Sequence, residues 1–161
     1  ISEIKVGDKP TKTVLTGTAM RSKLIVNVYA IGSYVEEGAG IRTAADLLTC
    51  DKIKRLHLVM ERNVSGSDFA EAFRAAVRMN YNPPMFQEEI DSLVAYMKTT
   101  SLRKGDNIYL THLPGTGLHI SVPGKADFLI KNTKFSQAIW EIYLGKNNLG
   151  ENIKKGLVNR L

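Results

Sequence analysis

A chain of 161 residues is long enough for one domain with a hydrophobic core, and 43% hydrophobic and 24% charged residues are typical of a globular protein. The net charge of +6 is spread along the chain and interrupted by acidic residues, which argues against a nucleic-acid partner. No apolar run approaches the roughly 18 residues of a membrane span, and the single cysteine, Cys50, excludes an internal disulfide. We expect one domain over residues 1–161; the oligomeric state stays open.

The N-terminal part of the chain predicts strands. The first twenty residues indicate an extended arm followed by a short strand at KTVLTG, and residues 23–35 predict a long strand because they are rich in Val, Ile and Tyr. Alternation along this strand divides its side chains between two faces, Ile25, Asn27, Tyr29 and Ile31 on one and Leu24, Val26, Val28 and Ala30 on the other. Since both sets are largely apolar, we expect the strand to be sandwiched between two layers.

Residues 43–61 predict a short helix followed by a strand. Thr43 and Asp46 have the spacing of a capping box for a helix through Leu48. The segment KIKRLHLVME then alternates, which places Lys54, Leu56, Leu58 and Met60 on one face of a half-buried strand.

The rest of the chain predicts helices interrupted by one hairpin. Ser65 or Ser67 can cap a helix that carries Phe69, Phe73, Ala76, Val77 and Asn80, and NYNPP ends it. A second helix carries Ile90, Leu93, Val94 and Met97, residues 103–122 predict a hairpin, and two C-terminal helices are marked by Phe135, Ile139 and Ile142 and by Ile153, Leu157 and Leu161. This order predicts an α+β fold, an antiparallel sheet covered on one face by helices.

No catalytic motif is present in the sequence. The three histidines, His57, His112 and His119, lack the spacing of a zinc site, and neither PGTG nor PGK has the length of a phosphate-binding loop. We therefore expect no metal site and no catalytic residues. A haem needs only one or two axial ligands, so these histidines do not exclude one.

Arg21, Asn27 and Tyr29 are unusual because they are polar groups in or beside an otherwise apolar strand. A guanidinium and a phenol together suit a carboxylate or an enolate, the arginine supplying charge and a donor fork and the tyrosine a further donor. The alternative is structural: Arg21 pairs with a nearby acid and Tyr29 donates to a backbone carbonyl. Spacing alone leaves both interpretations open.

The segment NVYAIGSYVEEGAG resembles a strand of chalcone isomerase and its non-catalytic relatives. SGSDFAEAFRAAV, KGDNIYLTHLPGTGLHISVPGK and KFSQAIWEIYLGKNNLGENIKKGL resemble, in order, the first long helix, the hairpin and the C-terminal helices of that family. The short spacing from Arg21 to Tyr29 and the PGTG hairpin are closer to its bacterial members. The resemblance implies an open-faced β-sandwich, a large antiparallel sheet under a helical layer, with a ligand cleft between them.

When the active-site positions of chalcone isomerase are matched to this chain, the resemblance implies that most of the polar residues are replaced. The resemblance places Arg21 at its cleft arginine and Tyr29 at its strand threonine, while Phe69, Ala76 and Ile142 stand where it has a tyrosine, an asparagine and a threonine. Tyr143 lies beside Ile142. Loss of these positioned donors argues against chalcone isomerisation.

The resemblance therefore implies a non-catalytic binding protein of this fold, like its fatty-acid-binding branch. The ligand is expected to be an amphipathic anion such as a fatty acid, or haem, held by Arg21, Tyr29 and Asn27 in a cleft that Phe69, Phe73, Ala76, Ile142 and Tyr143 line. One alternative is an isomerase or lyase that acts on an enone with Arg21 and Tyr29 as an electrophilic pair; another is an interaction protein whose own side chains fill the cleft. For location, the bacterial resemblance implies the periplasm or secretion, with the cytoplasm as the alternative.

Overall fold

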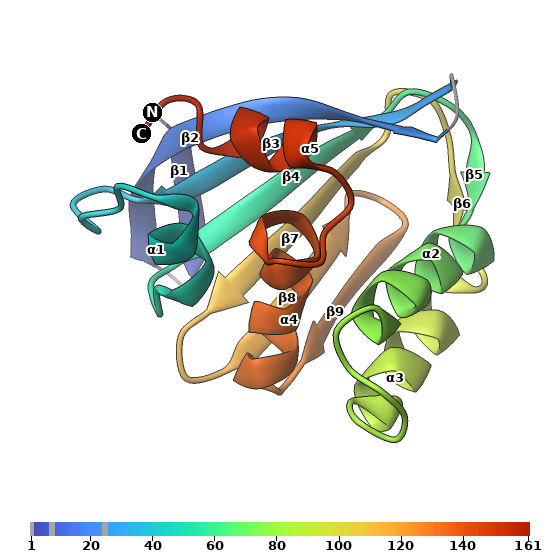
Figure 1. Ribbon diagram of the computed structural model, residues 1–161. Coiled ribbons are helices and arrows are strands. Elements are labelled where there is room, and N and C mark those ends of the chain that lie inside the picture. The colour runs from blue at the N-terminus through green and yellow to red at the C-terminus, as the bar shows by residue number, and fades with distance from the viewer. Residues whose placement is uncertain (1, 7–8, 24–25) are drawn as a thin grey trace.

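The computed structural model describes residues 2–6, 9–23 and 26–161, and its main feature is a seven-stranded antiparallel sheet with helices on one side (Figure 1). The sheet strands lie in the spatial order β1 (Ser2–Val6), β2 (Lys9–Lys23), β3 (Val26–Glu36), β4 (Lys54–Met60), β7 (Asn107–Leu113), β8 (Gly117–Val122) and β9 (Ala126–Ile130). Two short strands, β5 (Val64–Ser65) and β6 (Ser101–Leu102), pair separately. The predicted α+β class, with its open-faced sheet under a helical layer, is confirmed.

The helical layer consists of α1 (Ala44–Thr49), α2 (Gly66–Arg78), α3 (Gln87–Met97), α4 (Thr133–Leu144) and α5 (Glu151–Leu157) (Figure 1). The predicted capping box of α1 is present, and the Ser65 hydroxyl caps α2 by accepting from the Asp68 N–H at 3.1 Å. None of the described helices is long and apolar enough to cross a membrane.

The sheet face under the helices carries the hydrophobic core. Alternate residues of β4 are buried, starting with Lys54, as the sequence pattern predicts. The neighbouring strands β3 and β7 contribute their own alternate residues, so that apolar side chains meet those of α2, α3 and α4. Fully buried members of this core include Ile31, Leu56, Leu58, Ile90, Phe135 and Trp140.

Several elements differ from the sequence-based predictions. The N-terminal arm with its short strand is in fact the β1–β2 hairpin, in which β2 runs for 15 residues. β9 was not predicted. Its exposed positions include an apolar residue, Leu129, which is 37% exposed on the open face, so the sequence lacks a clear alternation of polar and apolar residues there. Leu161 lies beyond the end of α5 and is 43% exposed.

The predicted sandwiching of the strand after residue 23 is wrong. Tyr29 and Ile31 are buried under the helices, whereas on the opposite face Val26 is 41% exposed and Val28 and Ala30 are half-buried. The described helices all lie on one side of the sheet, so no second helical layer covers this face (Figure 1). The predicted positions of Leu24 and Ile25 lie outside the described residues.

Helix α5 lies directly on β2 because two glycines allow a close approach. A Cβ atom at Gly17 would overlap the Gly156 carbonyl oxygen, and one at Gly156 would lie 2.5 Å from the Thr18 carbonyl oxygen. The Thr16 hydroxyl donates to the Leu157 carbonyl at 2.7 Å, which fixes the end of the helix on the strand. This packing places the loop before α5 beside Arg21, whose Nη1 lies 3.5 Å from the Leu149 carbonyl oxygen.

Candidate ligand-binding site

Arg21 and Tyr29 face each other across the β2–β3 pair. They are register partners, and directly opposite residues of an antiparallel pair point to the same side of the sheet, here the helical side. Arg21 is half-buried, and its guanidinium hydrogen bonds within the described part of the chain go to carbonyl oxygens, of Ser22 at 3.3 Å and Leu149 at 3.5 Å. Among the described residues no carboxylate lies within ion-pair distance of it. The structural pairing of Arg21 with a nearby acid is therefore not observed.

Tyr29 forms a buried pair with Tyr143 of α4, their hydroxyl oxygens 2.7 Å apart. Burial raises the pKa of Tyr29 to about 12, opposed by the Tyr143 hydrogen bond and the charge of Arg21, and burial also raises the pKa of Tyr143 well above its usual value. Both phenols are thus protonated at neutral pH. Two hydroxyl protons serve one mutual hydrogen bond, so one proton remains for an acceptor in the cavity.

A small apolar cavity of about 50 Å³ lies beside this pair. Its polar end is formed by Arg21 and Tyr29, and its walls come from α2, α4 and the loop before α5, through Phe69, Ala72, Phe73, Ala76, Ile142 and Leu149. Neither an acidic residue nor a histidine is among these lining residues. The cavity therefore offers a cation and a neutral donor but no general base.

Two further hollows continue the cavity in opposite directions. On the outside, a surface hollow of about 360 Å³ shares Arg21 and Leu149 with it, so these two residues stand at its mouth. On the inside, a wholly apolar void of about 10 Å³ shares Phe69 and Phe73, whose ring centroids are 4.9 Å apart. The phenylalanine pair thus separates the polar end from a void against the sheet lined by Leu93, Leu110, Leu118, Ile120 and Ile139.

The structure brings together most of the residues that the sequence indicated. Six of them line the cavity: Arg21, Tyr29, Phe69, Phe73, Ala76 and Ile142. Tyr143 lies behind Tyr29 and reaches the cavity through it.

Asn27 is the exception among the predicted site residues. Its side chain is exposed and accepts a hydrogen bond from the Ser22 hydroxyl at 2.7 Å, and it is not among the residues that line the cavity. A bulge follows Arg21 in the β2–β3 register, so the inward-facing alternation ends at Tyr29. Sequence reasoning missed Ala72 and Leu149; the only signal for Leu149 is an apolar residue in the polar loop LGKNNLG.

None of the three histidines is among the residues that line this cavity. His57 stacks on Tyr109, and His119 lies 2.6 Å from an oxygen of Asp127. His112 is buried between Asp51 at 2.8 Å and Ser136 at 2.7 Å, and burial lowers its pKa. The cavity of about 50 Å³ and its lining therefore do not fit a haem with a histidine ligand.

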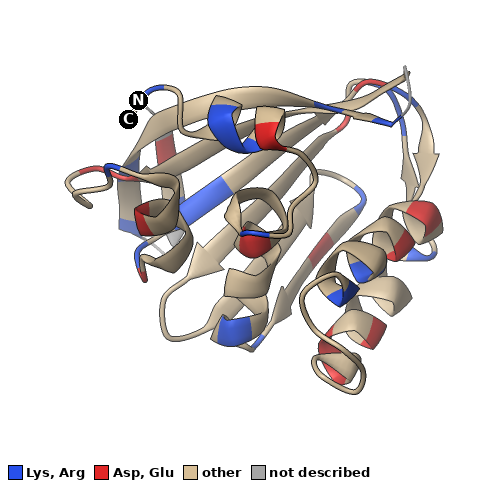
Figure 2. Ribbon diagram, in the orientation of Figure 1, with Lys and Arg blue, Asp and Glu red and all other residues tan. Residues whose placement is uncertain are grey.

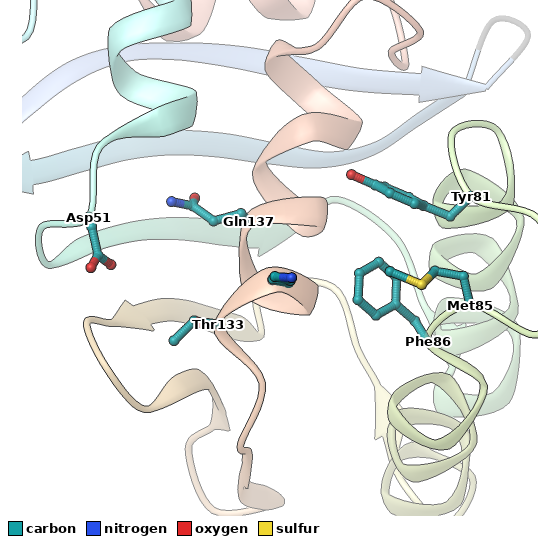
Figure 3. Close-up of a pocket in the computed structure, with 7 residues that line it drawn as sticks. Asp51, Tyr81, Met85, Phe86, Thr133 and Gln137 are labelled. Atoms are coloured by element: carbon teal, nitrogen blue, oxygen red, sulfur yellow. The ribbon is translucent and has the colours of Figure 1, made fainter.

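A broader hollow of about 330 Å³ lies between the start of α4 and the connection from α2 to α3 (Figure 3). Figure 3 shows Tyr81, Met85 and Phe86 on one side and Asp51 and Gln137 on the other. Three of its polar side chains already have partners: the Tyr81 hydroxyl donates to Glu141 at 2.7 Å, Gln137 accepts from Lys54 at 2.6 Å, and Asp51 lies 2.8 Å from His112. We therefore place the candidate site at Arg21 and not here.

The family model described as chalcone isomerase-like matches residues 2–159 of the chain. The chain belongs to the chalcone isomerase-like family. The resemblance in the sequence is thereby confirmed, and it covers both β2, which carries Arg21, and α4, which carries Tyr143.

Comparison with solved structures supports the same fold for this chalcone isomerase-like protein. A fatty-acid-binding protein of Arabidopsis thaliana superposes with a TM-score of 0.73 over 98% of this chain and 96% of its own, at 17% sequence identity. A comparison with curated protein sequences found no match.

Proposed function

We propose that this protein binds a fatty-acid-like amphipathic anion in the Arg21 cleft and does not catalyse a reaction. The observation that carries the proposal is a guanidinium without an acidic partner among the described residues, beside a neutral phenol, at the mouth of an apolar cavity. Arg21 supplies charge and Tyr29, supported by Tyr143, supplies a neutral donor, which together suit a carboxylate. The fatty-acid-binding protein of the same fold supports this choice of ligand class.

The acyl chain has one apolar route from this polar end. It leads past Phe69 and Phe73 toward the void against β7 and β8, where every lining residue is apolar. The two internal volumes, about 50 and 10 Å³, are far below the roughly 300–1,000 Å³ of ligand pockets. Binding therefore requires the phenylalanine rings to turn and α2 to move from the sheet, so the ligand selects a more open state.

The same small volumes favour a second candidate, an interaction protein whose cleft is filled by its own side chains. The enone isomerase or lyase alternative has less support, since no general base lies among the described residues that line the cavity.

Native mass spectrometry of the purified protein, with a visible absorption spectrum of the same sample, tests the proposal. We expect an added mass that is released as a fatty acid, either as purified or after incubation with one. A chain that stays free of ligand after incubation with saturated fatty acids of graded length would contradict the proposal and support the filled cleft. A Soret band would instead identify haem as the ligand.

A further inference from the structure

The open face of the sheet has a hollow of its own, which we call the outer-face hollow. It measures about 240 Å³ and is lined by β1 to β4 and β7 through Glu3, Ile4, Thr13, Tyr34, Arg55, His57 and Tyr109. Arg55 and His57 alternate with the core residues Leu56 and Leu58, so they project away from the helices and from the Arg21 cleft. The two sites therefore lie on opposite faces of one sheet.

Arg55 is held in a fixed position in this hollow. Its Nε donates to the Thr111 hydroxyl at 2.8 Å, and its guanidinium carbon lies 4.9 Å from the centroid of the Tyr109 ring. No Asp or Glu among the described residues lies within ion-pair distance of it. The two terminal nitrogens have no hydrogen-bond partner among those residues and form an open donor fork.

Aromatic side chains line the outer-face hollow beside the guanidinium of Arg55. The His57 ring stacks on Tyr109 with centroids 4.5 Å apart, and its Nε2 lies 2.8 Å from the Asn107 side-chain oxygen. Tyr34 lies over Gly32, where a Cβ atom would be 3.4 Å from the tyrosine ring. The Tyr34 hydroxyl has no hydrogen-bond partner among the described residues, so it is a second free donor.

We propose that the outer-face hollow is a second binding site, for a small molecule that presents a carboxylate or a phosphate group. The terminal nitrogens of Arg55 bind two oxygens of the anion side by side, and the Tyr34 hydroxyl donates to it. Because Nε and the guanidinium plane are already fixed by Thr111 and Tyr109, little side-chain entropy is lost on binding. Glu3 at the rim weakens the site for anions.

The test is a two-dimensional amide NMR titration of the full chain with inorganic phosphate and, separately, with acetate, at constant ionic strength. We expect saturable shifts grouped around Arg55, Tyr34 and His57. Arg55→Gln should weaken this binding at least about tenfold, the loss of one charge-assisted fork. Glu3→Gln should strengthen it, because a like charge is removed.

Lys98→Gln is the matched control, since it removes one positive charge at the exposed end of α3, on the helical side of the sheet, and should leave these shifts unchanged. Tighter binding of phosphate assigns the site to phosphate compounds, and tighter binding of acetate assigns it to carboxylates. The amide spectrum of each variant reports directly whether it is folded. Absence of saturable shifts with both anions, or shifts that survive Arg55→Gln in a folded protein, would overturn the proposal.

Discussion

At the scale of single residues, Lys54 is an informative side chain outside the cleft. It is fully buried on the helical face of β4, where its ammonium group donates to the Leu47 and Leu48 carbonyls at 2.9 Å each and to Gln137 at 2.6 Å. It lies 5.2 Å from the centroid of the Trp140 ring. All three donors are used, so Lys54 ties the last turn of α1 to α4 and leaves no donor for a ligand.

The buried position of Lys54 predicts a pH dependence of stability. Burial lowers its pKa from 10.5 to about 8, so between these values the unfolded chain binds more protons and the free energy of unfolding rises with pH. We expect the free energy of unfolding of wild type, measured relative to that of Lys54→Met, to rise by up to about 3 kcal/mol from pH 8 to 10.5. Urea unfolding at a series of pH values measures it.

Comparison with a variant cancels the titration of groups that do not interact with Lys54. Lys52→Met removes the same charge at an exposed neighbouring position and serves as the control. If the stability curves of wild type and Lys54→Met run parallel across this range, Lys54 is not buried as a charged group in solution.

At the scale of elements, the proposed function makes α2 the wall of the cleft that moves when a ligand binds. Its buried side, including Phe69, Phe73 and Ala76, faces the cavity, while α4 behind it is held by a side-chain cap from Asn132 and by the Tyr143–Tyr29 hydrogen bond. At the end of α2, Arg78 donates to the Tyr81 and Met85 carbonyls and fixes the turn into α3. We therefore expect α2 and α3 to move together when the cleft opens.

Replacement of Phe73 should join the two internal voids. Phe73→Ala removes a buried ring, which typically costs about 3–5 kcal/mol of stability, and leaves a continuous apolar space from Tyr29 toward Leu118. We expect a lower midpoint of urea unfolding together with tighter binding of fatty acids.

Binding is measured on the folded fraction, and Phe86→Ala, a buried ring outside this cavity, is the matched control for stability loss. Equal loss of stability without any gain in binding by Phe73→Ala would show that the acyl chain does not pass this ring.

At the scale of the whole molecule, one sheet separates two surfaces of different character. The helical side carries a small apolar cleft with one cation at its mouth, and the open side carries polar, basic and aromatic side chains. Figure 2 shows positively and negatively charged residues at separate positions along the described strands and helices. Each of the two proposed sites depends on an individual arginine, Arg21 on the helical side and Arg55 on the open side.

Sequence patterns predicted those features that depend on neighbours along the chain. The capping box of Thr43 and Asp46, the alternation from Lys54 to Met60 and the hairpin of β7 and β8 are local, and all three are present. The Tyr29–Tyr143 pair and the position of Leu149 depend on contacts over more than 100 residues, which no local pattern encodes.

The periplasmic or secreted location stays a prediction from the family resemblance. The haem alternative stays a prediction that the absorption spectrum checks. The family resemblance carried the assignment of Arg21, because spacing alone left its role open.

The dissociation constant of a saturated fatty acid for wild type and Arg21→Gln tests the central claim most directly, measured by isothermal titration calorimetry. Arg42→Gln, which removes an equal charge at an exposed position that does not line the cavity, is the control. We expect Arg21→Gln to weaken binding by at least about tenfold, the typical loss of a charge-assisted hydrogen bond, while Arg42→Gln binds like wild type. Equal affinity of Arg21→Gln and wild type would contradict Arg21 as the carboxylate anchor.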